Sequence, residues 1–370
     1  MFEAGFLPPG GSLSVPSVWV TDGTAAGTRR LVFPGTNAAI GQRLLGAAGR
    51  RVFVRAISSG SGGKQEIHAQ DVQTGSSERI LAGFAFSPTA SSVALFFATG
   101  AGLYRSDGTA RGTRRLRPGP VTGEFLALAD GLLSEAPAQG RVGVFFARAK
   151  SKQLLTTLPA GTSYTRVGDR ALFRCGSGGQ EDLWSTDGTP GETVIVASPN
   201  PASVPGIYPC LGRALLLNTQ ALGANEAWAS DGTPRGTAPF TTLPEVFYFP
   251  FAVADTGDTC MFFVGGPQPP GGLWKTDLTP EGTQRVADVY LSLIQEAATG
   301  GSKRAFFSAF DADDGAEPWI SDGTPEGTHE LADLLPGSLG SEPAEFTTVG
   351  PRVFWSDERR LRPRPLDGGD

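Results

Sequence analysis

One eleven-residue phrase occurs six times in this chain of 370 residues, and its spacing restricts the folds that the chain can adopt. The copies read VWVTDGTAAGT, LYRSDGTARGT, LWSTDGTPGET, AWASDGTPRGT, LWKTDLTPEGT and PWISDGTPEGT. Their aspartates are Asp22, Asp107, Asp187, Asp231, Asp277 and Asp322. Successive aspartates are 85, 80, 44, 46 and 45 residues apart, so the period is near 45 and each of the first two intervals spans about two units. A fixed period of this size indicates repeated supersecondary units.

Two eroded copies fill the two long intervals. One reads QEIHAQDVQTG, where Asp71 follows His68 by the three places that separate the aromatic residue and the aspartate in the phrase. The other is only a trace, VFFARAKSKQLL, around Phe145 and Phe146. The total is then eight units, in agreement with 370 residues divided by 45, which gives 8.2.

Each unit contains four short runs that are typical of β-strands. From Tyr164 onward they read YTRVG, RALFRC, EDLWSTD and TVIVAS, which are rich in β-branched and aromatic residues and separated by turn residues. Four strands in every 45 residues predict an all-β fold, a β-propeller of four-stranded antiparallel blades. We expect eight blades, with seven as the alternative if the trace unit has collapsed, in one domain over residues 1–370.

The two ends of the chain predict how the ring closes. MFEAGF resembles a second strand and SVWVTD a third, whereas EFTTVG and RVFWSD near the end resemble a first and a second strand. The N-terminal and C-terminal strands should therefore share one blade.

Composition and charge exclude several other classes of protein. Gly and Pro together make up 80 of the 370 residues, which excludes a helical bundle, and much of the excess falls in the repeated turns. The net charge of −6 has no concentrated basic region, so we expect no nucleic-acid partner. No apolar run is long enough to span a membrane, and the start, MFEAGFLPPGG, shows no signal peptide. We therefore predict no membrane insertion, and we expect a monomer.

The chain has three cysteines, Cys175, Cys210 and Cys260. Three is too few, and odd, for a disulfide framework. Buried free thiols are the default expectation, with a single Cys175–Cys210 bridge as the alternative.

The repeated side chains have structural explanations. An aromatic residue precedes each aspartate by three places: Trp19, Tyr104, Trp184, Trp228, Trp274 and Trp319. One large ring per blade fills the wedge between neighbouring sheets, with a sugar-stacking ring as the alternative. The aspartate is expected to accept hydrogen bonds within a hairpin turn between strands three and four, with cation binding as the alternative. The fifth copy has Leu278 where the others have Gly, which argues against a glycine-dependent ligand site in every blade.

The phrases EDLWSTDGT and EPWISDGTPEGT resemble the ELWxxDGT repeat family, bacterial tandem repeats known mainly from large exported or surface-associated proteins. The resemblance covers nearly the whole chain. It implies a propeller-like protein, located extracellularly or on the cell surface, with no established catalytic role. The turn is also similar to the Asp-box hairpin of sialidase-type propellers, which is structural there. The acidic residue two places before the aromatic is present as Asp182, Glu226 and Glu317 and is replaced by Ser17, Gly102 and Gly272.

Candidate sites are few. In a propeller the loops from strand two to three, and from strand four to the next blade, share one face, and here these loops vary in sequence. The acidic stretch FDADDGAEPW offers Asp311, Asp313 and Asp314 as weak candidate Ca²⁺ ligands, with a solvated acidic turn as the alternative. No GxSxG or HExxH motif occurs, and only two histidines are present, so we expect no catalytic residues and no bound cofactor other than that candidate Ca²⁺.

Two functions remain. The first is a non-enzymatic recognition or adhesion module that binds a protein or glycan ligand on the loop-rich face. The alternative is a carbohydrate-active enzyme, similar to sialidase or lyase propellers, with a site at the mouth of the central channel. Such an enzyme needs paired carboxylates or an arginine cluster there.

Overall fold

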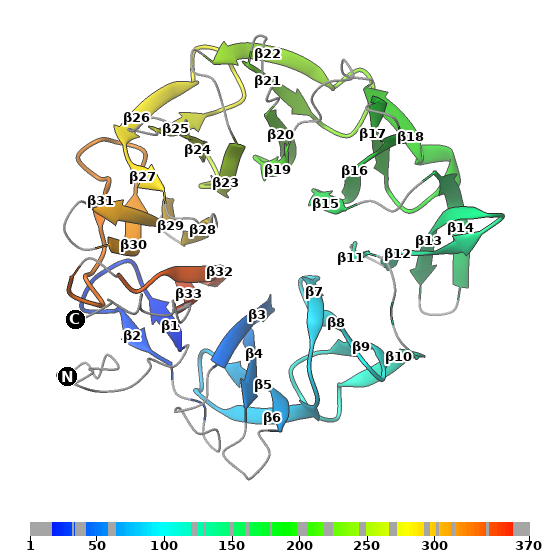
Figure 1. The fold of residues 1–370 in the computed structure, drawn as a ribbon, viewed down its shortest axis with the longest axis horizontal. Coiled ribbons are helices and arrows are strands. Elements are labelled where there is room, and N and C mark those ends of the chain that lie inside the picture. Colours follow the sequence, from blue (N-terminus) through cyan, green and yellow to red (C-terminus); the bar gives the residue numbers. More distant parts are fainter. Residues whose placement is uncertain are drawn as a thin grey trace, which may run out of the picture.

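The computed structural model describes residues 17–31, 33, 42–57, 64–119, 121, 124–128, 131–148, 151–159, 163–177, 180–197, 206–217, 225–243, 249–265, 272–291, 297–300, 303–311, 315–337 and 340–357. Within these ranges the strands form eight antiparallel sheets, arranged as a ring of blades (Figure 1). The predicted eight-bladed propeller is confirmed, and the seven-bladed alternative is wrong.

We letter the blades A to H and give each one from its inner to its outer strand. Blade A contains β32 (Pro343–Val349), β33 (Arg352–Asp357), β1 (Val18–Thr21) and β2 (Arg29–Arg30). Blade B contains β3 (Gln42–Ala48), β4 (Arg51–Ile57), β5 (Gln65–Asp71) and β6 (Ser77–Ala82). Blade C contains β7 (Phe86–Ala90), β8 (Leu95–Thr99), β9 (Gly102–Ser106) and β10 (Arg114–Pro118). Blade D contains β11 (Phe125–Ala127), β12 (Leu132–Ala138), β13 (Arg141–Arg148) and β14 (Ser151–Leu158).

The second half of the ring repeats this order. Blade E contains β15 (Tyr164–Val167), β16 (Arg170–Ser177), β17 (Gln180–Thr186) and β18 (Val194–Ala197), with a 3-10 turn, η2 (Pro190–Glu192), before β18. Blade F contains β19 (Gly206–Cys210), β20 (Arg213–Leu217), β21 (Asn225–Ser230) and β22 (Ala238–Leu243). Blade G contains β23 (Phe249–Asp255), β24 (Cys260–Gly265), β25 (Gly272–Thr276) and β26 (Gln284–Asp288). In blade H, β27 (Tyr290–Leu291) and β28 (Ala297–Gly300) both pair with β29 (Arg304–Asp311), which is followed by β30 (Gly315–Ser321) and β31 (His329–Glu330).

Blade A closes the ring with strands from both ends of the chain. β33 pairs with β1, where Trp355 lies opposite Trp19, so the shared blade predicted from the sequence is confirmed. β33 occupies the second-strand position of this blade. The segment MFEAGF, for which the same position was predicted, lies outside the described residues.

A β-bulge in the outer strand recurs in six blades. In blade E, Leu183 pairs with Ala197 but Trp184 pairs with Ile195, so Val196 is the extra residue and its side chain is buried between blades. The extra residue of the bulge is apolar in each case: Ile80, Leu116, Leu155, Val196, Phe240 and Val286. The same register shift follows Ile67 in blade B and Val144 in blade D, which gives His68 and Phe145 the position of the repeated aromatic residue. The two eroded units are therefore true blades.

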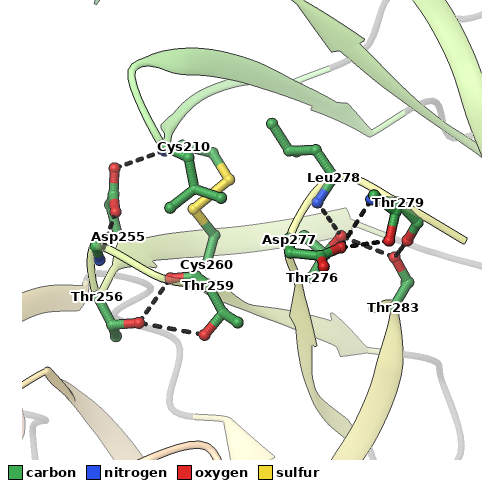
Figure 2. The surroundings of a disulfide bond; sticks show 12 residues. Cys210, Asp255, Thr256, Thr259, Cys260, Thr276, Asp277, Leu278, Thr279 and Thr283 are labelled. Carbon is green, nitrogen blue, oxygen red and sulfur yellow. Dashed lines mark hydrogen bonds between the residues drawn. A yellow bond between two sulfur atoms is a disulfide. The ribbon is translucent and has the colours of Figure 1, made fainter. Parts of the chain in front are cut away.

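A disulfide joins two neighbouring blades. Cys210 ends β19 of blade F, Cys260 begins β24 of blade G, and both are fully buried (Figure 2). The predicted alternative, a Cys175–Cys210 bridge, is wrong, and so is the expectation that Cys210 and Cys260 are free thiols. Cys175 is buried and forms no disulfide. It lies toward the end of β16, opposite Asp182 of β17, whereas Cys210 lies where β19 turns into β20. The two cysteines therefore occupy opposite ends of their blades.

The second strand begins with an arginine in five blades. The first residue of the second strand is Arg51, Arg170, Arg213, Arg304 or Arg352. Arg51 donates from Nη1 to the carbonyl oxygen of Gly108 in the next blade, at 3.2 Å, and Arg352 donates to Val72 O at 3.1 Å. In blade G, Cys260 pairs with Thr276 as Ala171 pairs with Thr186 in blade E, and it forms a covalent bond to the preceding blade.

Candidate functional site

The repeated aspartate organises the turn between the third and fourth strands. In blade F, Thr233 donates to Asp231 Oδ1 from its backbone nitrogen at 2.8 Å and from Oγ1 at 2.7 Å, and Gly236 N donates to Thr233 Oγ1 at 3.0 Å. The same two bonds hold the aspartates of the other five copies: Asp22, Asp107, Asp187, Asp277 and Asp322. Each carboxylate therefore bonds within its own turn.

The Ser or Thr before the aspartate ties the two strands together. Ser230 Oγ lies 2.6 Å from Thr237 Oγ1 and accepts a hydrogen bond from Gly232 N, while Thr237 Oγ1 donates to Thr233 O. Equivalent hydroxyl pairs occur in the other copies, between Thr21 and Thr28, Ser106 and Thr113, Thr186 and Thr193, Thr276 and Thr283, and Ser321 and Thr328. These hydroxyls satisfy one another at buried or half-buried positions, which explains why the phrase has a hydroxyl residue at both places.

The two glycines of the phrase are required for different reasons. Gly232 has a φ of 83°, and a Cβ atom there would lie 2.7 Å from Arg170 Cδ of the preceding blade. A Cβ atom on Gly236 would lie 2.1 Å from the Asp231 carboxylate. Blade E has Glu192 at the second position, and its turn forms the 3-10 segment η2, with Glu192 paired to Arg170 at 3.4 Å.

The turn aspartates are held in the ionised form. The hydrogen bond from Thr24 lowers the pKa of Asp22, and the equivalent threonine lowers the pKa of Asp107, Asp231, Asp277 and Asp322. A Ca²⁺ ion needs about six to eight oxygen ligands, and each turn offers one carboxylate. Within the described part of the chain, no three His, Cys, Asp or Glu side chains gather closely enough to hold a metal ion.

The acidic metal candidates are only partly described. Asp311 is the last residue of β29, and Asp313 and Asp314 lie outside the described residues.

Four of the six repeated aromatic residues stack on a ring of the neighbouring strand. Trp184 stacks on Phe173 with a centroid distance of 6.2 Å, and the rings of Tyr104 and Phe97 lie 5.7 Å apart. Trp19 stacks on Trp355 and Trp274 on Phe262, while Trp228 and Trp319 pack against inter-blade clusters. All six rings are buried or half-buried, so they contribute to the blade interfaces.

The acidic residue before the aromatic has a different partner in different blades. Glu226 accepts a hydrogen bond from Trp228 Nε1 at 3.0 Å. Glu317 instead accepts bonds from Leu334 N, Leu335 N and from both Ser341 N and Ser341 Oγ, so it holds the connection from blade H to blade A. Burial raises the pKa of Glu317 to about 7, against the hydrogen bonds that lower it.

A small cleft lies between blades A and B on the short-turn side. It has a volume of about 200 Å³, and three arginines line it: Arg29, Arg30 and Arg352. Asp71 also lines the cleft and is buried. Its carboxylate forms an ion pair with Arg50 Nε at 2.7 Å and accepts hydrogen bonds from Gln73 N and Thr74 N.

An arginine pair lies at the other end of the strands, on the loop-rich side. Arg43, near the start of β3, lies directly opposite Arg55, near the end of β4, in the register of the two strands. Arg43 Nε lies 3.7 Å from Glu345 Oε1 of blade A, and the Arg55 guanidinium lies over the ring of Phe84 at 4.3 Å. Phe84 is 46% exposed. Arg43 and Glu345 belong to β3 and β32, which are the inner strands of their blades (Figure 1).

The arginines of this cluster carry an electrostatic cost. Burial and the neighbouring Arg43 lower the pKa of Arg55. No hydrogen bond to Arg55 occurs among the residues described. Sequence analysis missed this cluster, because its members come from blades A and B and from the connection between blades B and C, and belong to no repeated phrase.

Comparisons with known proteins identify the fold alone. No family model matches the chain, and no curated protein matches it. Among solved structures, the chain is similar to puromycin hydrolase, with a TM-score of 0.51 and 13% identity over 81% of this chain and 54% of that chain. It therefore spans about half the length of that enzyme.

Two other matches cover most of both chains. The β-propeller domain of the trilobed protease from Pyrococcus furiosus has a TM-score of 0.51 and 12% identity, over 79% of this chain and 98% of that chain. An oligogalacturonate lyase in complex with manganese has a TM-score of 0.51 and 10% identity, over 84% of this chain and 87% of that chain. The chain is a β-propeller protein.

Proposed function

We propose that this chain belongs to the ELWxxDGT repeat family and acts outside the cell or on its surface as a non-enzymatic recognition module for a protein or glycan ligand. The observation behind this proposal is the difference between its two faces. The repeated polar side chains bond within the short turns, as Asp231 does with Thr233. At the opposite end of the strands, Arg43, Arg55 and Phe84 follow no repeat and include an exposed ring.

The disulfide supports the extracellular location. Disulfides form and persist in oxidising compartments and are rare in the bacterial cytosol. Cys210 and Cys260 meet across a blade interface, where both are fully buried. Fractionation of the native cells, with blocking of free thiols before lysis, tests this location: an intracellular, reduced chain would contradict it.

The binding function is tested with the folded, oxidised protein on a glycan array and in a pull-down from envelope extract. We expect at least one saturable ligand. Empty results in both assays, with folding verified by circular dichroism, would contradict the proposal.

The alternative, a carbohydrate-active enzyme, gains one argument from the Arg43–Arg55 pair, because such an enzyme would use an arginine cluster to hold an acidic sugar. Glycosidase and lyase turnover assays on acidic oligosaccharides separate the two functions. Product formation that disappears in Arg55→Gln would favour the enzyme.

A further inference from the structure

We propose that the cleft between blades A and B binds the phosphate or sulfate group of a small molecule through Arg29 and Arg352. Arg29 belongs to the outer strand β2, Arg352 begins β33, and both line the cleft. The turn between β5 and β6 contributes Val72 and Gly75 to the lining, so the cleft lies at the short-turn end of the strands. It is therefore a second site, apart from the loop-rich surface of the proposed recognition function.

The two guanidinium groups have N–H donors to spare. Arg352 donates from Nη1 to Val72 O at 3.1 Å, and this is its one hydrogen bond among the residues described. Arg29 is exposed and has no hydrogen-bond or ion-pair partner within the described part of the chain. Each guanidinium carries five N–H donors, so most of them remain for a ligand. Arg30 also lines the cleft but already interacts within the chain, and no ligand contact is assigned to it.

The carboxylates around the cleft are held by other groups. Asp71 forms an ion pair with Arg50 Nε at 2.7 Å and accepts hydrogen bonds from two backbone nitrogens of its own turn. Asp22 accepts its hydrogen bonds from Thr24 and attracts Arg352 only through space. Neither carboxylate therefore forms a hydrogen bond with the two arginines that would hold the ligand.

Gln70 adds a hydrogen-bond acceptor to the cleft. It is only 8% exposed, and its Nε2 donates to Gly75 O at 2.9 Å. This bond fixes the orientation of the amide, because a carbonyl oxygen accepts only from the nitrogen. Gln70 Oε1 then has no partner among the residues described, and a largely buried acceptor without a donor costs free energy. A hydroxyl group of the ligand, next to its anionic group, supplies that donor.

The size and lining of the cleft indicate the class of ligand. Its volume of about 200 Å³ is below the ~300–1,000 Å³ of pockets that enclose drug-sized ligands, so it holds an end group and the carbons beside it. Val20, Leu31 and Phe354 line it with apolar surface, which favours an anion on a carbon skeleton over a free ion. A phosphate or sulfate ester has three terminal oxygens for two guanidinium groups, whereas a single guanidinium matches both oxygens of a carboxylate.

The test is isothermal titration of the full, oxidised chain with glycerol phosphate, glycerol sulfate, glycerate and glycerol, which differ only in the end group. We expect at least one of the two esters to bind saturably and at least about tenfold more tightly than glycerate or glycerol, with affinity that falls as salt is raised. The tighter of the two esters identifies phosphate or sulfate as the natural end group.

Variants of Arg29 test the site itself. Arg29→Gln should weaken ester binding by about fivefold or more, and the charge reversal Arg29→Glu by at least about fiftyfold. The matched control is Arg114→Gln, because Arg114 is also exposed and, like Arg29, lies opposite the residue that follows the repeated aromatic of its blade. It should leave binding unchanged.

A substitution of Gln70 tests the predicted hydroxyl contact. Gln70→Met keeps the size of the side chain but removes the acceptor, so it should weaken glycerol phosphate binding by about threefold or more. Methyl phosphate has no hydroxyl group on its carbon, so the same variant should bind it as wild type does. Arg29→Gln should weaken the binding of both compounds.

The outcomes are separate from those of the recognition function. If neither ester binds the folded chain, or if Arg29→Glu binds them as tightly as wild type, the site is wrong. If glycerate binds more tightly than both esters, the cleft takes carboxylates and the inferred ligand class is wrong. A ligand from the glycan array that binds wild type and Arg29→Glu equally supports the recognition function whatever the cleft binds.

Discussion

Leu278 of blade G and Cys210 of blade F lie in one buried cluster, across the interface that the disulfide bridges (Figure 2). Leu278 has a φ of 68°, in the left-handed region where the equivalent Gly232 has 83°. It is only 7% exposed, and its side chain belongs to the buried cluster that contains both cysteines. In this blade, apolar packing against the preceding blade offsets the backbone strain that glycine avoids elsewhere.

An alanine substitution usually costs less stability than a glycine substitution, but at Leu278 we expect the reverse. Leu278→Gly loses the buried side chain but relieves the positive φ, so we expect a loss of about 1–3 kcal/mol in the free energy of unfolding. Leu278→Ala loses the side chain and keeps the strain, so it should be less stable than the glycine variant by about 1 kcal/mol. Urea denaturation measures both. An alanine variant at least as stable as the glycine variant would contradict this account.

Removal of the Cys210–Cys260 bridge should destabilise the ring. It closes a loop with a sequence separation of 50 residues, for which chain entropy predicts a loss of about 4 kcal/mol. Thermal unfolding of wild type with and without reductant, beside the Cys210→Ala/Cys260→Ala variant, measures the effect. The double variant should be insensitive to reductant, whereas Cys175→Ala should keep the full response of wild type.

Substitutions of Asp231 and Gly236 should have strongly coupled effects on the free energy of unfolding. Gly236→Ala places a Cβ atom where the Asp231 carboxylate lies, so it should cost more than 1 kcal/mol in wild type. In the Asp231→Ala background that collision is absent, and the same substitution should cost about 1 kcal/mol less. A double-mutant cycle by urea denaturation gives the coupling free energy, and a value near zero would show that the aspartate does not fix the glycine.

Glu317 should make the chain less stable as the pH rises from about 4.5 to about 7. Its pKa is raised in the folded state, so the folded chain binds more protons than the unfolded chain in that window, and stability falls with rising pH. The turn aspartates act in the opposite direction: their lowered pKa values make stability fall as the pH drops below about 3.8. Urea midpoints between pH 4 and pH 8 should show the slope in wild type and in Glu226→Gln, but not in Glu317→Gln.

Much of the fold could be predicted because one landmark recurs in most blades. The aspartate fixes the end of the third strand in six blades, and Asp71 does so in the eroded unit around His68. The period of about 45 residues then locates the unit around Phe145, which has no aspartate. The partners of the disulfide could not be predicted from how far apart the cysteines lie in the sequence. Its partners are set by which strand ends meet across an interface, and Cys210 meets Cys260 of the next blade, not Cys175.

The candidate site was harder to predict than the fold. Sequence reasoning indicated the loop-rich face and the channel mouth, but it selected Asp311, Asp313 and Asp314 because clustered acids are conspicuous in a sequence. Arg43 and Arg55 are twelve residues apart, and only the register of β3 and β4 makes them neighbours. The contribution of Glu345 depends on closure of the ring, which brings β32 beside β3.

The composition of blade A also sets the order in which the chain can fold during its synthesis. β1 and β2 are made before the strands of the other seven blades, whereas their inner partners β33 and β32 are made after them. Until then, β1 presents an unpaired edge that accepts any matching strand. When two nascent chains lie close together, β33 of one can pair with β1 of the other, so polysome crowding should favour domain-swapped dimers.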